Sequence, residues 1–394
     1  MKIRINCLVI CFGALAGNAY AQSSVTLYGI VDAGFTYNTN SGGHSQIALT
    51  SGNGAGNRWG LKGTEDLGGG LAAVFELENG FSIVNGSIGQ GGTFFGRHAY
   101  VGLSSRDYGV LLLGRQTALS NDYVGRFASG SSWAAAGTGY GAHVGDIDNL
   151  VAVNRTNNTV KYRTPDWRGL TAAGAYALGG VAGDYTRNQI WQAALNYANG
   201  PVNLAATYLV AKDPNYSFFG NTAKGSATAT NLGSTPAYAG FANAGIQSIF
   251  AAGGQYKLGA LMIDAVYSNV QFSDLGATSV TGLTPKETAY RGKATFNTEE
   301  LNLMYYLSPS FMVAAAYNYT KMVGPDGEHA HYSQVNAGAR YFLSKSTGLY
   351  LVGVWQRAGG TDSTGKPAVA TISSVTPSTG RSQLVVTAGL TKRF

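Results

Sequence analysis

The chain has 394 residues, of which 45% are apolar and 12% charged, and its formal net charge is +7. A helical membrane protein needs repeated runs of about 20 apolar residues, whereas beyond residue 21 the longest aliphatic run is Val110–Leu113. A disordered chain would carry more charge and fewer aromatic residues than the 24 Tyr, 16 Phe and 5 Trp found here.

Residues 1–21 have the three parts of a secretory signal. Lys2 and Arg4 supply the positive start, an apolar stretch follows, and Ala19–Ala21 has the small residues of a cleavage site. The apolar stretch is too short to span a membrane. We therefore expect residues 1–21 to be removed and residues 22–394 to form one domain.

Both cysteines, Cys7 and Cys11, lie inside this segment, so the expected mature chain has neither a disulfide nor thiolate chemistry. Loss of Lys2 and Arg4 leaves 25 basic and 20 acidic residues, a net charge of +5. These charges are scattered and form no basic helix or arm, so we expect no nucleic-acid partner.

From residue 25 onward, apolar and polar residues alternate with the period of two that is typical of β-strands. Val25, Leu27 and Val31 share one face, whereas Thr26 and Asp32 lie on the other. Sixteen such segments are predicted, at residues 25–37, 57–66, 70–79, 95–105, 108–116, 156–164, 169–179, 189–199, 201–212, 249–258, 260–272, 292–307, 310–321, 332–343, 348–358 and 383–394. Most have the length of about 9–11 residues that a tilted strand needs to cross a bilayer, or are longer.

The connections between these segments alternate between short and long. Short connections such as Leu67–Gly69 and Ser105–Asp107 carry the Gly and Asp of tight turns. The long ones are polar and lie near residues 38–56, 80–94, 117–155, 180–188, 213–248, 273–291, 322–331 and 359–382. Outer-membrane barrels have short periplasmic turns and long external loops. We therefore predict an all-β fold, a 16-stranded antiparallel transmembrane β-barrel with both termini on the periplasmic side.

A barrel of this size encloses water, because side chains cannot fill it. Lipid-facing positions then take single apolar residues and lumen-facing positions take polar ones, which explains the dispersed composition. The 117–155 connection is the longest in the first half of the chain, and loops of this length are usually functional. Its small residues, among them Gly125, Gly130 and Gly137, would let it fold into the barrel. The alternative is a lid on the surface.

Several motifs resemble those of trimeric general porins of Gram-negative β-proteobacteria, of the Neisseria and Burkholderia type. They are Asn57–Leu71, Arg97–Ser105, Leu113–Gln116, Asn157–Tyr162, the opening Val25–Gly29 and the terminal Phe394. The resemblance covers the whole mature chain. It implies a homotrimer of 16-stranded barrels, with the third external loop folded inward to form a constriction. It also implies that Phe394 is the signal read by the barrel-assembly machinery.

The resemblance also assigns residues to the constriction. The family's basic wall falls on Arg58, Arg97 and Arg155, with Lys62 one inward step beyond Arg58. Alternation independently turns Arg58 and Lys62 inward, whereas for Arg97 only the resemblance supports this. The acidic partners should come from the third loop, where Asp146 and Asp148 are the best candidates and ordinary solvated positions are the alternative.

These residues predict an outer-membrane porin for passive diffusion of ions and small hydrophilic solutes. Bases outnumber acids at the expected constriction, so we expect weak to moderate anion selectivity. The expected partners are two further copies of the chain, outer-membrane lipid and lipopolysaccharide, and small anionic and neutral solutes.

Other classes of function have weaker support. A substrate-specific channel, for dicarboxylates or oligosaccharides, could use aromatic residues near the 213–248 loop: Tyr216, Phe218, Phe219, Tyr238, Phe241 and Phe250. An adhesin-like role for the external loops is a further alternative. His329 and His331 beside Glu328 could bind a metal, but an ordinary external loop is the favoured interpretation. We expect no catalytic, metal or cofactor site and therefore no enzyme.

Overall fold

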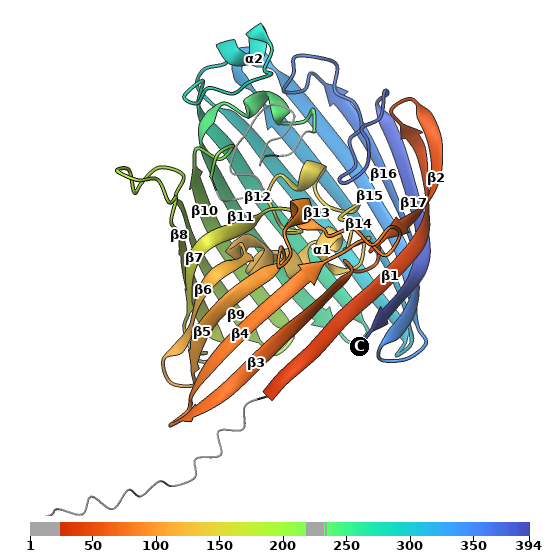
Figure 1. Ribbon diagram of the computed structural model, residues 1–394. Helices are drawn as coiled ribbons and strands as arrows, with labels where there is room; N and C mark the ends of the chain where they lie inside the picture. Colours follow the sequence, from red (N-terminus) through yellow and green to blue (C-terminus); the bar gives the residue numbers. More distant parts are fainter. Residues whose placement is uncertain (1–23, 218–231, 233–234) are drawn as a thin grey trace, which may run out of the picture.

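The computed structural model describes residues 24–217, 232 and 235–394, which form one closed antiparallel sheet (Figure 1). Its strands are β1 Ser24–Ser41, β2 His44–Ser51, β3 Arg58–Gly68, β4 Leu71–Gly80, β5 His98–Ser105, β6 Gly109–Thr117, β7 Arg155–Arg163, β8 Leu170–Ala177, β9 Ile190–Asn199, β10 Val202–Lys212, β11 Ala244–Leu258, β12 Leu261–Leu275, β13 Ala294–Ser308, β14 Phe311–Val323, β15 His329–Phe342, β16 Thr347–Gly360 and β17 Ser382–Arg393. The expected signal, residues 1–21, lies outside the described residues.

Short helical elements lie in the connections between strands. They are η1 Gln90–Gly92, η2 Ser120–Val124, η3 Gly125–Phe127, α1 Ser129–Ser132, η4 Val144–Asp146, η5 Ala239–Phe241, α2 Pro285–Ala289 and η6 Pro325–Gly327. Within the described part of the chain, no helix is both long and apolar enough to cross a membrane.

The barrel closes where the first strand meets the last. β1 pairs with β17 from Ile30 opposite Arg393 to Asn38 opposite Val385. The backbones of Gly29 and Phe394 exchange two hydrogen bonds of 3.0 Å, which extends this seam to the last residue. Successive strands are joined alternately at a short-turn end and a long-loop end, and α2 lies at the long-loop end (Figure 1). Among the described strands, all except β2 pair with a neighbour on both sides, so closure leaves few strand edges unpaired.

All sixteen predicted strands are present, but the prediction of a long loop without a strand near residues 38–56 was wrong. This region contains the end of β1 and a seventeenth strand, β2, which pairs with the outer half of β1 from Ala33 to Ser41. The part of β1 nearer the short-turn end, Ser24–Ile30, pairs with β3 instead. β2 and β3 therefore occupy one position in the wall, as two pieces separated by residues 52–57.

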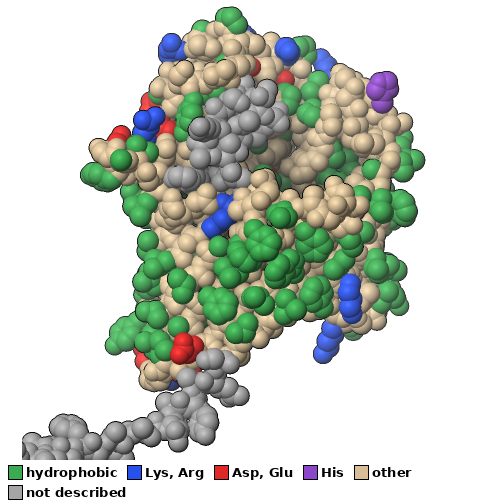
Figure 2. All heavy atoms as spheres, viewed as in Figure 1, with side chains coloured by type: hydrophobic (Ala, Val, Ile, Leu, Met, Phe, Trp, Pro, Cys, Tyr) green, Lys and Arg blue, Asp and Glu red, His purple; other side chains and the backbone are tan. Residues whose placement is uncertain are grey.

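The two faces of each strand have opposite environments, as alternation predicts. In β16, Leu349 and Leu351 are 44% and 54% exposed, whereas the intervening Tyr350 and Val352 are 5% and 1% exposed. Figure 2 shows the resulting outer surface, on which hydrophobic side chains gather over the middle and lower wall, while most of the charged side chains in view lie near the ends. This apolar band matches the lipid-facing surface of a transmembrane barrel.

The inward face packs against the connection between β6 and β7, residues 118–154, which we call the crossing loop. Leu119, Val124 and Phe127 pack with alanines of β8 to β11. Trp133 and Tyr140 pack with residues of β13, β14 and β16. Hydrogen bonds join the loop to strands far away in sequence: Trp133 Nε1 donates to Asn302, and Asn336 Nδ2 donates to Ser129 Oγ. In Figure 1 the loop and α1 lie inside the outline of the barrel.

Candidate functional site

Three arginines predicted from the sequence are brought together at the rim of the crossing loop. Arg58 begins β3, Arg97 immediately precedes β5, and Arg155 begins β7. All three line one cavity of 540 Å³. Arg155 is only 5% exposed, and its buried Nε has no hydrogen-bond partner among the described residues. β3, β5 and β7 alternate with β4 and β6 in the wall, which explains why residues far apart in sequence meet here.

A carboxylate that the sequence did not single out lies among these arginines. Arg97 Nε donates to Glu78 Oε1 at 2.6 Å, and Arg58 Nε lies 3.8 Å from Glu78 Oε2. The Glu78 side chain is only 5% exposed, so these contacts hold the two guanidinium groups in place. Alternation could have pointed to Glu78. Gly60 lies on the same inward face of β3 as Arg58, and Glu78 is its partner in β4, so Glu78 faces inward as well.

Arginines from strands on the other side of β1, and from the crossing loop, complete the cavity. Arg340 of β15 donates from Nη2 to the carbonyl oxygens of Gly54 and Trp133, at 3.1 Å each. Arg393 of β17 and Arg126 of η3 also line the cavity. The described lining thus contains six arginines and no Asp, Glu or Lys. We call this space the arginine cavity.

Lys62 lies on the inward face but away from the arginine cavity. Its partners in the sheet are Thr26 and Glu76, nearer the short-turn end, and its Nζ lies 5.3 Å from the centroid of the Tyr28 ring. The structure therefore groups Arg58, Arg97 and Arg155 and leaves Lys62 one step further along the lumen.

Asp146 and Asp148 are not among the described residues that line the arginine cavity, contrary to the expectation that they oppose the basic wall. They are 3% and 0% exposed. The Asp146 carboxylate accepts the backbone N–H groups of Val151 and Val153 at 2.9 and 3.0 Å. Burial and hydrogen bonding within the loop explain why neither faces open solvent.

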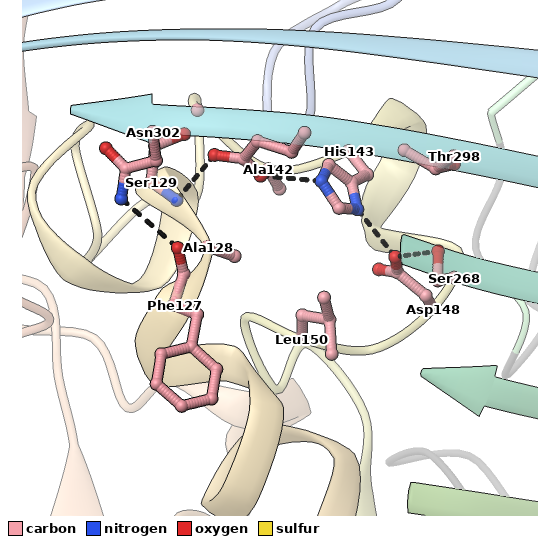
Figure 3. Close-up of polar contacts among 12 residues, drawn as sticks. Phe127, Ala128, Ser129, Ala142, His143, Asp148, Leu150, Ser268, Thr298 and Asn302 are labelled. Carbon is pink, nitrogen blue, oxygen red and sulfur yellow. Dashed lines mark hydrogen bonds and ion pairs between the residues drawn. The ribbon is translucent and has the colours of Figure 1, made fainter. Parts of the chain in front are cut away.

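Asp148 belongs to a buried charged cluster that ties the crossing loop to the wall. Its Oδ2 is 2.6 Å from His143 Nδ1 and accepts the Ser268 hydroxyl at 2.6 Å (Figure 3). The other ring nitrogen of His143 is 2.6 Å from Glu300 Oε2, and Ser129 N–H donates to Glu300 Oε1 at 2.7 Å. One histidine thus bridges a loop carboxylate and a carboxylate of β13.

Burial and charge act in opposite directions on His143. Burial alone would lower the pKa of His143, but the carboxylates of Asp148 and Glu300 outweigh it and hold this pKa well above 6.5. Burial and the charge of Asp148 raise the pKa of Asp146 to about 7. We therefore expect a protonated imidazole between two carboxylates at neutral pH.

Two other candidate sites from the sequence, the aromatic residues near the 213–248 loop and Glu328, contain residues that are already packed or hydrogen-bonded. Tyr238 and Phe241 are 6% and 0% exposed and pack in a cluster of aromatic residues at the long-loop end. Phe218 and Phe219 lie outside the described residues. Glu328 accepts hydrogen bonds from Tyr290 at 2.8 Å and pairs with Lys286 at 2.6 Å.

Among the described residues, one group of possible metal ligands is Glu76, Glu78 and His98. Tyr100 donates to Glu76 at 2.6 Å, Tyr28 donates to it at 2.7 Å, and Arg97 pairs with Glu78. Protein donors therefore satisfy both carboxylates without a cation.

Comparisons with known proteins agree with the fold described above. A family model described as Gram-negative porin matches residues 7–361. An outer membrane porin protein of Bordetella pertussis is 38% identical over 219 residues, 49% of this chain and 55% of the relative. Outer membrane porin protein 32 of Delftia acidovorans is 39% identical over 177 residues, 42% of this chain and 47% of the relative. The chain thus spans about half the length of the curated relatives it matches.

Solved structures share the fold over nearly the whole chain. The anion-selective porin from Comamonas acidovorans has a TM-score of 0.70 at 22% identity and covers 94% of this chain and 100% of its own. The trimer form of OmpT, an outer membrane protein of Vibrio cholerae, has a TM-score of 0.62 at 14% identity over 94% of this chain and 99% of its own.

Proposed function

Because the chain belongs to the Gram-negative porin family, whose members are β-barrels of the outer membrane, we propose that it forms a water-filled channel for passive diffusion. The solutes are ions and small hydrophilic molecules, with a moderate preference for anions. Family and fold are those of channels, so the proposal includes no catalytic step and no cofactor.

The observation that carries the anion preference is the arginine cavity. Six guanidinium groups from the wall and the crossing loop line it, and the nearby Glu78 offsets about one of those charges. In a narrow passage with low-dielectric walls, fixed charge of one sign concentrates counter-ions and sets selectivity. The crossing loop narrows the passage on this proposal, since its residues 131–138 and 151–153 supply much of the cavity lining.

Reversal potentials across planar bilayers in a KCl gradient test this proposal. We expect chloride to be preferred and the preference to fall in the triple variant Arg58→Gln, Arg97→Gln, Arg155→Gln. The matched control removes three exposed arginines of turns and an outer loop, Arg106, Arg168 and Arg187, which do not line the cavity. Both variants lose the same net charge, so only position distinguishes them.

A cation-selective wild type contradicts the anion preference. An equal loss of selectivity in both triple variants means that the total charge of the protein sets selectivity and that the position of the arginines in the cavity does not. An unchanged potential in the first variant removes Arg58, Arg97 and Arg155 from the conducting path.

We also propose a homotrimer, which the exposed residues of the 81–97 connection support. Ile83, Val84, Ile88 and Phe94 are 41%, 46%, 42% and 52% exposed, although they lie beyond the end of β4 at the long-loop end. A neighbouring copy would cover such a patch. The proposal further includes removal of residues 1–21, contact with lipid and lipopolysaccharide, and recognition of Phe394 by the barrel-assembly machinery.

A further inference from the structure

The longest aliphatic run of the mature sequence, Val110–Leu113, conflicts with simple alternation. Leu111 and Leu113 are 38% and 45% exposed on the outer face of β6. Because successive side chains of a strand point to opposite faces, Val110 and Leu112 face the lumen. Water would favour polar residues at these two positions, so the run requires a reason other than contact with lipid.

Val110 and Leu112 line a second cavity, of 480 Å³, which we call the vestibule pocket. The crossing loop contributes Leu119 and Tyr123 to its lining, and β8 contributes Ala173. Two further rings, of His98 and Tyr100, also border it. The volume lies in the range of about 300–1,000 Å³ that is usual for small-molecule sites, and such sites are mostly apolar with a few fixed polar groups.

The charged groups of the vestibule pocket are mainly cationic. Arg126, Lys161 and Arg163 line it together with one acid, Asp122. Asp122 pairs with Lys161 at 2.8 Å, which leaves the two arginines as the net charge. Arg126 donates to the neutral amide oxygens of Asn196 and Asn203. The ion pairs found among the described residues do not include Arg126 or Arg163.

The vestibule pocket and the arginine cavity are neighbours, because Thr117 and Arg126 line both of them. Val110 and Thr171 are the second residues of β6 and β8, and each of these strands begins directly after a short turn. The pocket therefore lies between the crossing loop and the short-turn end.

We propose that the vestibule pocket binds small aromatic monocarboxylates of the benzoate class. Val110, Leu112 and the aromatic rings contact the ring of the solute, and Arg163, which is paired with Val110 across β6 and β7, binds its carboxylate. The proposal rests on the channel function for access to the pocket, and it adds a saturable site to general diffusion.

Benzoate and acetate are the test pair, because they share the carboxylate and differ in the ring. In wild-type channels we expect each to reduce the chloride current, with a half-saturating benzoate concentration roughly tenfold below that of acetate. Calorimetric titration of the detergent-solubilised protein with the two salts measures the same difference without requiring conduction.

Two variants locate the site. The double variant Val110→Thr, Leu112→Thr removes apolar contact. It should raise the half-saturating concentration of benzoate severalfold and leave that of acetate unchanged. Arg163→Gln should weaken the binding of both anions. Its matched control Arg168→Gln, on an exposed turn, should weaken the binding of neither. Arg163 is exposed, so this second variant does not depend on repacking a buried position.

Equal binding of benzoate and acetate by the wild type overturns the proposal. So does unchanged discrimination in the double variant, or equal effects of the two arginine variants. A protein that does not conduct contradicts the channel function alone, because the calorimetric titration still decides whether the pocket binds benzoate.

Discussion

At the scale of single residues, the barrel seam depends on the absence of a side chain at Gly29. A Cβ atom at this position would lie 2.3 Å from Phe394 Cζ and 2.7 Å from the Arg58 carbonyl oxygen. One of these neighbours is backbone, so rotation of the Phe394 ring alone cannot make room. Gly29 therefore lets the last residue of the chain lie against the first strand.

We expect Gly29→Val to destabilise the folded barrel by about 1–3 kcal/mol, the usual cost of overpacking a tight site. The urea concentration at half-unfolding and the fraction of heat-modifiable barrel on electrophoresis measure this. Gly174→Val is the control, since a Cβ at Gly174 would lie 3.9 Å from the nearest atom. Equal stability of the two variants would show that the seam tolerates a side chain at Gly29.

Alternation and the family resemblance together pointed to several of the lumen-facing residues. Inward parity placed Arg58 and Lys62 on the lumen face, and resemblance identified Arg97 and Arg155, which share the arginine cavity with Arg58. Arg340 was not identified, because one arginine among alternating residues carries no local sign of what lies across the barrel. That information depends on the register of fifteen other wall positions.

At the scale of elements, the sequence predicted every wall strand but not the break in the second one. His44–Ser51 does alternate, with Ile47 and Leu49 on the outer face at 77% and 50% exposure. Its short length and the polar, Gly-rich residues around it are equally typical of a loop. The break is stabilised by tertiary bonds, such as Asn53 Nδ2 to Thr387 Oγ1 at 2.9 Å, which no local pattern reveals.

The attachment of the crossing loop should weaken as pH rises. The folded-state pKa of His143 is held above its unfolded value, so its contribution to stability is complete below about pH 6.5 and is lost as pH rises through the higher folded value. Asp146 acts in the same direction between about pH 4 and 7, because its raised pKa makes ionisation costly in the folded state. Asp148 and Glu300 are the charged groups that face His143.

Current fluctuations of wild-type channels should accordingly become more frequent as the pH rises above about 6.5. His143→Gln removes the cation between two carboxylates, which costs roughly 3–5 kcal/mol for a buried pair. We therefore expect frequent fluctuations already at the acidic end and little further change with pH. His44→Gln, at an exposed position of β2, is the control. A wild type whose current becomes quieter as pH rises would contradict this dependence.

At the scale of the whole molecule, the trimer should depend on the 81–97 connection. Ile83→Asp with Ile88→Asp places two charges on the exposed patch and should convert trimers to monomers, as measured by native mass spectrometry in detergent. Tyr185→Asp is the control, because Tyr185 is 78% exposed on a different outer loop. Retention of trimers by the double variant would place the interface elsewhere on the barrel.

The overall architecture was the most predictable level, because period-two alternation and the lengths of connections are properties of every hairpin. The environment of Asp146 and Asp148 was the least predictable. Whether a loop acid faces a channel or a buried histidine depends on the path of about thirty residues across the lumen, and small residues permit many such paths.

The crossing loop also sets an order of events during folding. Ser129 bonds to Glu300, which lies 171 residues away, and Gly141 bonds to Asn336, 195 residues away. Contacts of such long sequence separation form slowly, and here they need both halves of the wall in place. We therefore expect the strands of the wall to pair before the crossing loop docks, so that the passage reaches its final width in a late step. A membrane holding newly closed barrels would for a time be leakier than one holding mature channels.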